Sequence, residues 1–385
     1  MDTKKLCVFP NDPINAYYLK GEIRERYFNP NNFFEEIHII VFEDEDIEEE
    51  KIKEIAGNAK LKIHCMGKIN FKNRNQIKKN IIKIISEINP NVLRAYNIRL
   101  EGWMAAYCSK KLNIPFLLSI HTENQQKRKW MKKKNLKKFL ILKIFENKIE
   151  PFVIKQAKKI ILIYSSLEPY IKKKGGKNLE VLYNSIDLDK FSNGKRVETL
   201  PKPLIISVGN LSDVKNHQCI IKSMKEINAN LLIIGKGEKE KELKKIIKNL
   251  RIENKVIMIP NVKYSEIENY YKSADIFALA FDPKLETMPK PVIEAMASGL
   301  PVIIPVIEKK FSEGLENYTV FAKREPKEFA EKINMILKDK KMLEKFSALS
   351  VEKAKEFDSK ILEQKESSIY SKLINEANMD NDFKN

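Results

Sequence analysis

Two glutamates, Glu286 and Glu294, are the residues whose type and spacing first suggest chemistry in this sequence. They lie in the segment 284–305 (KLETMPKPVIEAMASGLPVIIP), which is typical of a loop, a short helix and a buried strand. Prolines suit the start of such a helix, and Gly299 followed by Pro301 ends it. One carboxylate is therefore expected just before the helix and the other about one turn inside it. Such a pair can hold hydroxyl groups beside an anion-binding helix end, although Glu294 could equally be a solvated helix residue.

A lysine and two glycines follow other apolar runs of the second half. Gly209 and Asn210 end one run, and Lys215 leads into the next helical pattern, where a cation can neutralise a phosphate. Gly235 closes the following run and permits a close backbone approach. The dinucleotide fingerprint G-x-G-x-x-G is incomplete because position 240 is Glu, and the sequence contains no Walker loop. These features argue against dehydrogenase and ATPase functions.

Polar residues also follow apolar runs in the first half of the chain. His121 comes directly after the run 116–120, so it is expected at the carboxyl edge of a sheet, where we favour a functional role. Asn11 and Asp12 hold the same position after the first run of the chain. No metal site is predicted: Asp44-Glu45-Asp46 lies in an acidic run that opens a helix, and Asp380-Asn381-Asp382 lies in a polar tail.

Composition indicates a globular chain of two domains. The sequence has 385 residues, of which 43% are hydrophobic, and no apolar run reaches the roughly 18–20 residues needed to span a bilayer. Four scattered cysteines and an N-terminus without a leader pattern favour a cytoplasmic protein. The net charge is +19, and eight of the twelve residues in Lys127–Lys138 are basic. This segment suggests an anionic partner such as phospholipid or nucleic acid, while compositional bias or a solvated face explains the same charge.

Short β-like runs alternate with helical patterns, which is typical of a doubly wound α/β fold. Strands are expected at 6–10, 37–42, 61–66, 92–96, 116–120, 160–164 and 181–183, and then at 204–208, 231–234, 256–259, 276–279, 302–304 and 319–321. One long helix is expected at 136–159, with a break at Pro151. The polar stretch 184–203 is interpreted as a linker between the two halves, whose sheets would face a cleft. This gives a first domain at 1–192, a second at 203–355 and a C-terminal helical segment at 356–385.

Four motifs of the second half occur in a familiar order. They are Ser-Val-Gly-Asn-Leu at 207–211 with Lys215, Leu-Ile-Ile-Gly-Lys-Gly at 232–237, Tyr-Lys-Ser-Ala-Asp at 271–275, and Glu286 with Glu-Ala-Met-Ala-Ser-Gly-Leu-Pro at 294–301. This set resembles glycosyltransferase family four, the retaining, nucleotide-sugar-dependent transferases of the GT-B fold. The first half resembles the family more loosely, through His121 and through Val-Leu-Tyr-Asn-Ser-Ile-Asp at 181–187 with Phe191. The resemblance implies two Rossmann-like domains, with the C-terminal segment packed on the first.

The resemblance also implies roles for individual residues. Lys215 would contact the donor diphosphate, Glu294 the ribose and Glu286 the transferred sugar, while His121 would sit near the reacting carbon. His121, Lys215 and Glu286 are therefore the expected catalytic residues. The other expected donor contacts are Gly209, Asn210, Gly235, Val262, Lys263, Thr287, Met288, Pro289 and Lys290. Asn11, Asp12 and His121 would form the acceptor side.

The sequence departs from the family pattern at three places. Asn210 stands where the family usually has Arg, Ser185 replaces a Gly, and Thr287–Lys290 replace a glycine-rich loop. Lys290 could supply the charge that Asn210 lacks. The resemblance implies a metal-independent reaction with a nucleotide sugar as co-substrate and no further cofactor. The acceptor would be a glycan, a lipid-linked molecule or a small molecule, and nucleic acid is not expected as a partner. A sugar-nucleotide epimerase of the same fold, or a non-enzymatic binding protein on this scaffold, are the alternatives.

Overall fold

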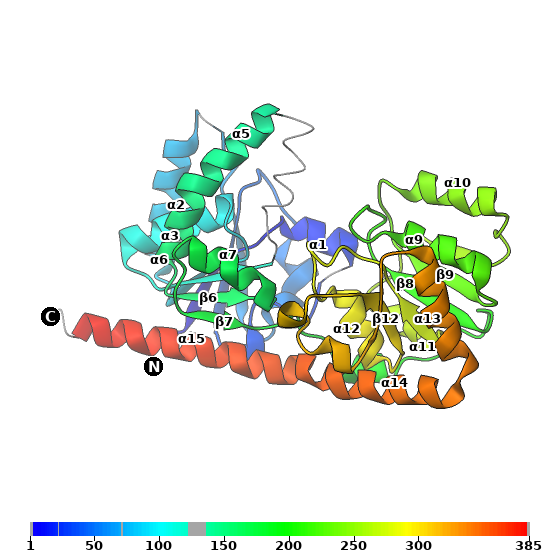
Figure 1. Ribbon diagram of the computed structural model, residues 1–385. Helices are drawn as coiled ribbons and strands as arrows, with labels where there is room; N and C mark the ends of the chain where they lie inside the picture. The colour runs from blue at the N-terminus through cyan, green and yellow to red at the C-terminus, as the bar shows by residue number, and fades with distance from the viewer. Residues whose placement is uncertain (1–2, 22, 71, 122–135, 383–385) are drawn as a thin grey trace. The chain divides into compact units, whose positions relative to one another are not determined.

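A computed structural model describes residues 3–21, 23–70, 72–121 and 136–382 (Figure 1). The chain forms two compact units, each built around its own parallel sheet. The first unit contains Met1–Tyr183 together with Leu362–Asn385, and the second contains Asn184–Ile361. Residues 184–203, which the sequence suggested as a linker, are thus counted with the second unit.

The first unit has a seven-stranded parallel sheet in the order β3-β2-β1-β4-β5-β6-β7. The inner strands β1, β4 and β5 are largely apolar and buried, as expected for a sheet covered by helices on both faces, whereas the edge strand β3 has the mixed sequence KLKIHC. The strands are β1 (Lys5–Phe9), β2 (Glu36–Val41), β3 (Lys60–Cys65), β4 (Val92–Ala95), β5 (Phe116–Ile120), β6 (Lys159–Leu162) and β7 (Leu179–Val181). The α-helices before β7 are α1 (Ile14–Lys20), α2 (Arg74–Ile88), α3 (Leu100–Leu112), α5 (Leu136–Ile144), α6 (Glu150–Gln156) and α7 (Glu168–Lys173).

The long helix expected at 136–159 is present as one continuous helical stretch from Leu136 to Gln156, interrupted only by a change of helix type. The chain forms α5, then a π-helical turn at Phe145–Ile149, then α6, and it enters β6 at Lys159. Pro151 follows the π-helical turn, in which the N–H of Glu150 donates to Phe145 O. The helix therefore does not end at Pro151 but changes its hydrogen-bond pattern just before it.

The C-terminal helix α15 (Ser359–Asp382) completes the core of the first unit. Tyr370 of this helix is fully buried, and Leu373 packs in the same core. The buried Arg94 of β4 donates hydrogen bonds to Glu366 and Tyr370 of α15 and to Ser119 Oγ at 3.0 Å. A buried guanidinium needs such partners, because leaving one unpaired costs several kcal/mol, of order 3–5. Arg94 thus fixes the helix to the sheet of this unit.

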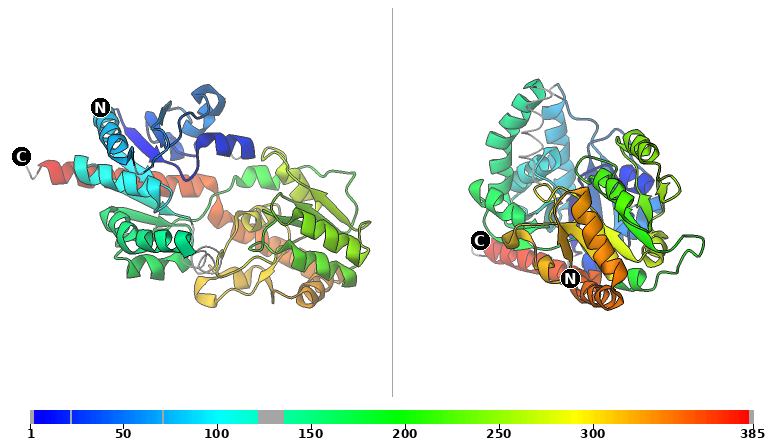
Figure 2. Two further views of the ribbon diagram at one scale, coloured as in Figure 1. Left: turned by 90° about the horizontal axis from the view of Figure 1, so that it is seen from above. Right: turned by 45° about the vertical axis from the view of Figure 1, so that its right-hand side comes forward.

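The second unit has a six-stranded parallel sheet in the order β10-β9-β8-β11-β12-β13. Its strands are β8 (Leu204–Val208), β9 (Asn230–Ile234), β10 (Val256–Ile259), β11 (Ile276–Ala278), β12 (Val302–Pro305) and β13 (Val320–Ala322). Its helices are α8 (Leu188–Ser192), α9 (His217–Ser223), α10 (Glu240–Leu250), α11 (Ile267–Ser273), α12 (Lys290–Ala297), α13 (Pro326–Lys338) and α14 (Lys340–Ala354). Helices α9, α10 and α13 share one core with the sheet, while α11 and α14 both contact α12 (Figure 2). The predicted α/β class with Rossmann-like sheets is confirmed, and a cleft between the units stays a prediction.

Each sheet reverses its strand order at one place. In the second unit β8 lies between β9 and β11, and in the first unit β1 lies between β2 and β4. Loops that leave the carboxyl ends of the strands diverge at such a topological switch point, and open α/β sheets bind ligands there. The loops after β8 and β11 carry Lys215 and Glu286, and the loop after β1 carries Asn11 and Asp12.

Candidate functional site

An ion pair joins the two loops at the switch point of the second unit. Lys215 Nζ lies 2.5 Å from Glu286 Oε2, although the residues are 71 positions apart in the chain. Lys215 is buried and the carboxylate of Glu286 is about one quarter exposed, with 28% of its side chain accessible. The backbone supports the same junction, because Asp282 N donates to Val214 O at 2.8 Å and Glu286 N donates to Asp282 O at 3.0 Å. The structure therefore brings together two of the three residues that were expected to be catalytic.

Glycines give the backbone room beside this lysine. Gly209 and Gly235 have φ angles of +150° and +154°, which residues other than glycine rarely adopt. A Cβ on Gly235 would lie only 2.0 Å from the carbonyl oxygen of Gly209, and one on Gly209 would lie 3.3 Å from Cδ of Lys215. The turns that contain Gly209 and Gly235 are thus in close contact, and the aliphatic stem of Lys215 packs against Gly209. Close approach requires a glycine at position 235, in agreement with the expectation, and the φ angle favours one at position 209.

A buried histidine that the sequence analysis did not single out holds this turn. His217, at the start of α9, has its Nε2 3.2 Å from Gly209 O and its Nδ1 3.0 Å from Ser207 Oγ. A carbonyl oxygen can only accept, so Nε2 carries the proton and Nδ1 accepts from the serine hydroxyl. The pKa of His217 is lowered to about 4, mainly by burial; the hydrogen bond to Gly209 opposes this shift and the charge of Lys215 adds to it. The ring is therefore neutral at pH 7 and fixes the backbone next to Lys215.

Glu294 lies inside α12 and is only 6% exposed, so the alternative of a solvated helix residue is wrong. Tyr271 of α11, which belongs to one of the motifs, donates its hydroxyl hydrogen bond to Glu294 Oε2 at 2.9 Å. Burial, followed by the charge of Glu294, raises the pKa of Tyr271 well above its usual value, so the phenol stays a donor. Glu294 is consequently held in one orientation by a neighbouring helix.

The loop that leads into α12 buries polar groups without pairing all of them. Thr287 is 3% exposed and Met288 is fully buried. Among the described residues, the Oγ1 atom of Thr287 and the Nζ atom of Lys290 are buried without a hydrogen-bond partner. Lys290 Nζ lies 5.0 Å from the centre of the Tyr264 ring, a cation–π distance. Buried polar atoms without partners cost free energy, and a bound ligand can supply what they lack.

The remaining expected donor residues are less constrained. Asn210 is exposed, and the backbone of the next residue, Leu211, donates to Lys236 O at 2.9 Å. Val262 is half-buried and Lys263 is exposed, on the loop after β10. The sequence analysis also missed Arg324, whose Nε donates to Ala280 O at 3.1 Å. Arg324 follows the last strand and belongs to none of the motifs, so the sequence gives no signal for it.

In the first unit, amide groups meet at the switch point. Asn97 Nδ2, on the loop after β4, donates to Asn11 Oδ1 at 3.2 Å, and Asn11 Nδ2 donates to Asp12 Oδ2 at 3.3 Å. Both bonds are exposed to solvent. Asp46, from the acidic run, accepts from the backbone N–H of Ile14, the first residue of α1, at 2.9 Å. The acidic run also opens a helix as expected, because the 3-10 helix Glu49–Ala56 has two glutamates in its first turn.

His121, the third residue expected to be catalytic, lies directly after β5 and is half-buried. The centre of its ring is 5.6 Å from that of Tyr96, with the planes tilted by 42°. Burial lowers its pKa to about 4, and the charge of Arg94 acts in the same direction. His121 is therefore neutral at pH 7 and surrounded by the aromatic and cationic groups of its own unit.

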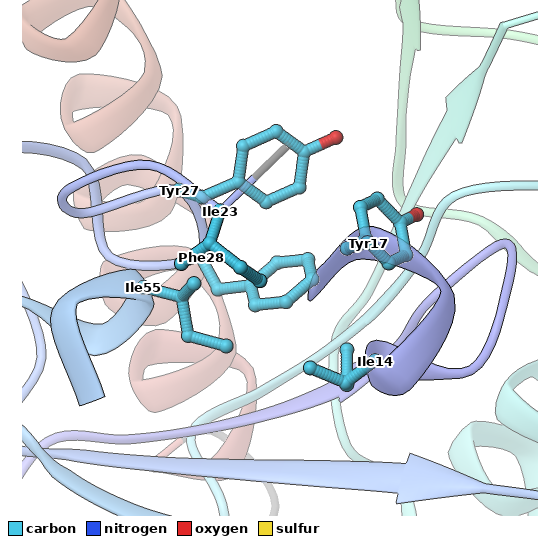
Figure 3. A pocket seen from close by; sticks show the side chains of 6 residues that line it. All are labelled: Ile14, Tyr17, Ile23, Tyr27, Phe28 and Ile55. Atoms are coloured by element: carbon cyan, nitrogen blue, oxygen red, sulfur yellow. The ribbon is translucent and has the colours of Figure 1, made fainter. Parts of the chain in front are cut away.

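A hydrophobic pocket lies beside α1 in the first unit (Figure 3). It is lined by Ile14, Tyr17, Ile23, Tyr27, Phe28 and Ile55. The rings of Tyr17 and Tyr27 have their centres 5.8 Å apart. Its lining offers apolar contact and no charged side chain.

Two further expectations concern metals and membranes. Within residues 3–21, 23–70, 72–121 and 136–382, no group of three or more His, Cys, Asp or Glu side chains is arranged to hold a metal ion. In that same part of the chain, none of the helices has the length and apolar character required to cross a membrane. Most of the basic segment Lys127–Lys138 lies outside the described residues, and only its last three residues fall in α5.

Comparison with known proteins finds a family match in the second unit. Residues 189–351 match the family model of glycosyl transferases group 1. The segment contains every expected donor residue, from Gly209 to Glu294.

Curated relatives carry matching names. An uncharacterized glycosyltransferase of Haemophilus influenzae is 36% identical over 113 residues, covering 28% of this chain and 31% of that protein. A Campylobacter jejuni N-acetylgalactosaminyltransferase that acts on a diphospho-undecaprenol substrate, according to its name, is 32% identical over 133 residues, with coverage of 33% and 34%. The O-antigen chain mannosyltransferase RfbU of Salmonella typhimurium is 27% identical over 183 residues, with coverage of 45% and 50%. The chain thus matches between about a third and a half of the length of these relatives.

Solved structures extend the likeness to both units at the level of the fold. HepE of Anabaena in complex with UDP has a TM-score of 0.75 at 14% identity, covering 96% of this chain and 100% of that one. Sucrose-phosphate synthase of Thermosynechococcus elongatus has a TM-score of 0.70 at 12% identity, with coverage of 96% and 99%. The chain therefore has the GT-B type of fold.

Proposed function

We propose that this protein is a glycosyltransferase that moves a hexose from a nucleotide-sugar donor to an acceptor hydroxyl, with retention at the anomeric carbon. The observation that carries the proposal is the Lys215–Glu286 pair at the switch point of the second unit. This pair lies within the segment that matches glycosyl transferases group 1. HepE, whose fold this chain shares, was crystallised in complex with UDP, which supports a nucleotide-sugar donor here as well.

The chemistry of the reaction explains why a cation belongs at this place. The bond between the anomeric carbon and the diphosphate oxygen breaks, and its electron pair goes to the departing nucleoside diphosphate. The acceptor oxygen bonds to that carbon and passes its proton to the oxygen of the departing diphosphate. Negative charge therefore grows on the diphosphate, and a positioned ammonium group stabilises it more in the transition state than in the ground state. Lys215 is the residue that we assign to this role.

In the structure Lys215 is paired with Glu286, which suggests how the site accepts its donor. A diphosphate would take Lys215 Nζ as its counter-ion, and the carboxylate of Glu286 would then bind hydroxyl groups of the sugar. Glu294 would hold the ribose from its fixed position against Tyr271. Thr287 Oγ1, which has no partner among the described residues, and the N-terminus of α12, which has no side-chain cap, would complete the contacts to sugar or phosphate.

The first unit is assigned to the acceptor. Its candidates Asn11, Asp12 and His121 offer neutral amides, one carboxylate and a neutral imidazole, which suit hydroxyl groups better than phosphates. The acceptor class stays as the sequence predicted: a glycan, a lipid-linked molecule or a small molecule. A cytoplasmic location, at or near the inner membrane surface, belongs to this proposal.

The test is a screen of UDP-, GDP- and ADP-sugars with the purified protein. Binding would be followed by calorimetry and turnover by release of free nucleoside diphosphate, with NMR of the product to give the anomeric configuration. The proposal predicts that one donor is bound and hydrolysed slowly without acceptor, and that Glu294→Ala weakens its binding. It is wrong if no donor is bound or turned over. A changed sugar with intact nucleotide would instead indicate an epimerase, and binding of DNA without donor binding would indicate a non-enzymatic binding protein.

A further inference from the structure

A lysine at the start of helix α12 has a buried ammonium group without a hydrogen-bond partner. Lys290 is the first residue of this helix, four positions before Glu294. Its Nζ atom is shielded from solvent, and none of the described residues accepts a hydrogen bond from it. An ammonium group carries three donors, and burying it without acceptors costs much free energy. A buried group of this kind indicates a ligand that supplies the missing acceptors.

The surroundings of Lys290 carry an excess of positive charge. Its Nζ lies 5.0 Å from the centre of the Tyr264 ring, and Lys190 Nζ lies 3.8 Å from the centre of the same ring. Lys190 is engaged, because it lies 3.5 Å from Glu268 Oε2 and donates to Tyr264 O. Two ammonium groups thus converge on one ring, and the nearby carboxylate pairs with Lys190. The ring face attracts the charge of Lys290 but provides no hydrogen-bond acceptor of the usual strength.

Other cations of these loops already have acidic partners. Lys215 Nζ lies 2.5 Å from Glu286 Oε2, and Arg324 Nη1 lies 3.8 Å from Asp282 Oδ2. Lys290 differs from both, because no acceptor of the described residues reaches its Nζ. An anion that binds at Lys290 therefore gains a charge-assisted hydrogen bond without displacing an acidic side chain from it.

The N-terminus of α12 favours an anion at the same place. Its N-cap residue, Pro289, makes no side-chain cap hydrogen bond, and the first turn contains no acidic residue. The first N–H groups of a helix lack partners inside the helix and favour negative charge. Thr287 gives an independent indication of a ligand, because it is only 3% exposed and its Oγ1 atom has no hydrogen-bond partner among the described residues.

We propose that Lys290 is the second cation for the diphosphate of the donor, and that it makes the site selective for donors with two phosphate charges. The inference rests on the proposed function, because it takes a nucleotide sugar as the ligand. A sugar linked to a nucleoside diphosphate carries one negative charge on each phosphate at neutral pH. Lys215 and Lys290 match these two charges once Glu286 turns from Lys215 to the sugar. A sugar linked to a nucleoside monophosphate, with its single charge, would leave one ammonium group without a counter-ion.

Calorimetric titration of the full-length chain with UDP, GDP and ADP, and with the matching nucleosides, tests this role. For the diphosphate that binds, Lys290→Met should raise the Kd about tenfold or more, because a charge-assisted contact is lost. Lys290→Arg keeps the charge and should raise the Kd by no more than about threefold. Lys284→Met is the matched control, because Lys284 is an exposed lysine of the same loop, and its Kd should equal that of the native chain. The Kd for the nucleoside should be the same in all four proteins.

Thermal unfolding of the ligand-free protein gives a second measurement. Lys290→Met replaces a buried ammonium group with an apolar group and keeps the aliphatic stem. The variant should therefore unfold at the same temperature as the native chain or at a higher one. Added nucleoside diphosphate should raise the unfolding temperature of the native chain more than that of the variant. A ligand-free variant that unfolds at a lower temperature would show that the ammonium group stabilises the fold, which would overturn the inference.

Three binding results would also overturn it. Lys290→Met could bind the diphosphate as tightly as the native chain does. The nucleoside could lose as much affinity as the diphosphate, which would place the ammonium group on the nucleoside. Complete nucleotide sugars alone could lose affinity, which would place it on the sugar. If the native chain binds none of the diphosphates, the proposed function fails too, whereas native binding that Lys290→Met leaves unchanged refutes only this inference.

Discussion

At the switch point of the second unit, a lysine and a glutamate lie 2.5 Å apart, whereas at that of the first unit two asparagine side chains meet at 3.2 Å. A Cβ at Gly235, in the turn after β9, would lie 2.0 Å from Gly209 O, and a Cβ at Gly102, inside α3, would lie 2.0 Å from Asn97 O. The two places present a cation in one unit and neutral amides in the other. From this difference we expect an anionic ligand at the second unit and a neutral, hydroxyl-rich ligand at the first.

The two places also differ in how firmly their side chains are held. His217 and Tyr271 are buried and bond to the groups beside Lys215 and Glu294. The bonds of Asn11 in the first unit are exposed to solvent. A pre-organised site costs less free energy when it binds its ligand, so we expect a fixed donor site and an adaptable acceptor site.

The largest effect is expected from Lys215→Ala. Removing the cation that faces the leaving diphosphate should lower kcat/KM for donor hydrolysis by about 100-fold or more. Lys241→Ala, which removes an exposed lysine of α10, is the control and should leave the rate unchanged. The rate at which nucleoside diphosphate is released measures the activity of both variants. A Lys215→Ala enzyme that keeps its full rate would remove the distinction between the two switch points.

The second largest effect is expected from substitution of Glu294. Glu294→Ala should raise the Kd for the donor about tenfold, which corresponds to about 1.4 kcal/mol, because the ribose loses its carboxylate partner. Tyr271→Phe removes only the hydrogen bond that orients Glu294 and should change the Kd by about threefold or less. Calorimetric titration gives both constants. Equal losses in the two variants would mean that Glu294 acts only through the packing of α12.

The neutral state of His217 predicts a pH dependence of stability. Its pKa in the folded protein is about 4, below its usual value of 6.5, so the unfolded chain binds more protons as the pH falls. The contribution of His217 is therefore complete above pH 6.5 and is lost progressively toward pH 4, by about 2 kcal/mol between pH 7 and pH 5.

Urea unfolding of the native chain and of His217→Gln at these two pH values measures this contribution. The glutamine amide can still donate to Gly209 O but does not titrate. The free energy of unfolding of the variant should therefore fall by about 2 kcal/mol less than that of the native chain over this interval. Identical falls would show that His217 is protonated in the folded protein.

The smallest effect on donor chemistry is expected from Asn11→Ala. An exposed substitution away from buried partners changes energies by about 0.5 kcal/mol or less, so donor hydrolysis should stay within about twofold of the native rate. Transfer to an acceptor should fall more, once the acceptor class is known. Loss of donor hydrolysis equal to that of Lys215→Ala would place the donor at the first unit instead.

The strands and the charged pair of the second unit were predictable because their signals are local. Apolar runs of three to five residues between helical patterns identify buried parallel strands, and Lys215 and Glu286 lie in the loops that follow two of these runs. The order of the motifs then linked them to one family.

Other features depend on contacts between distant residues. His217 is the first residue of a helix. The local sequence does not predict whether that histidine is exposed or buried against Ser207 and Gly209. Asp46 accepts a hydrogen bond from the first residue of a helix that starts 32 residues earlier, and Arg94 pairs with a residue 272 positions later. Local patterns carry no information on such partners, which explains why these supporting residues were missed.

Amide hydrogen exchange with and without nucleotide sugars tests the central claim most directly. With the donor that binds in the UDP, GDP and ADP series, the account predicts protection in the segments 209–217 and 286–294 of the second unit. The segments 11–15 and 97–101 of the first unit should exchange at unchanged rates until an acceptor is added. Protection that appears first at 11–15 and 97–101, with none at 209–217, would contradict the assignment of the donor to the second unit.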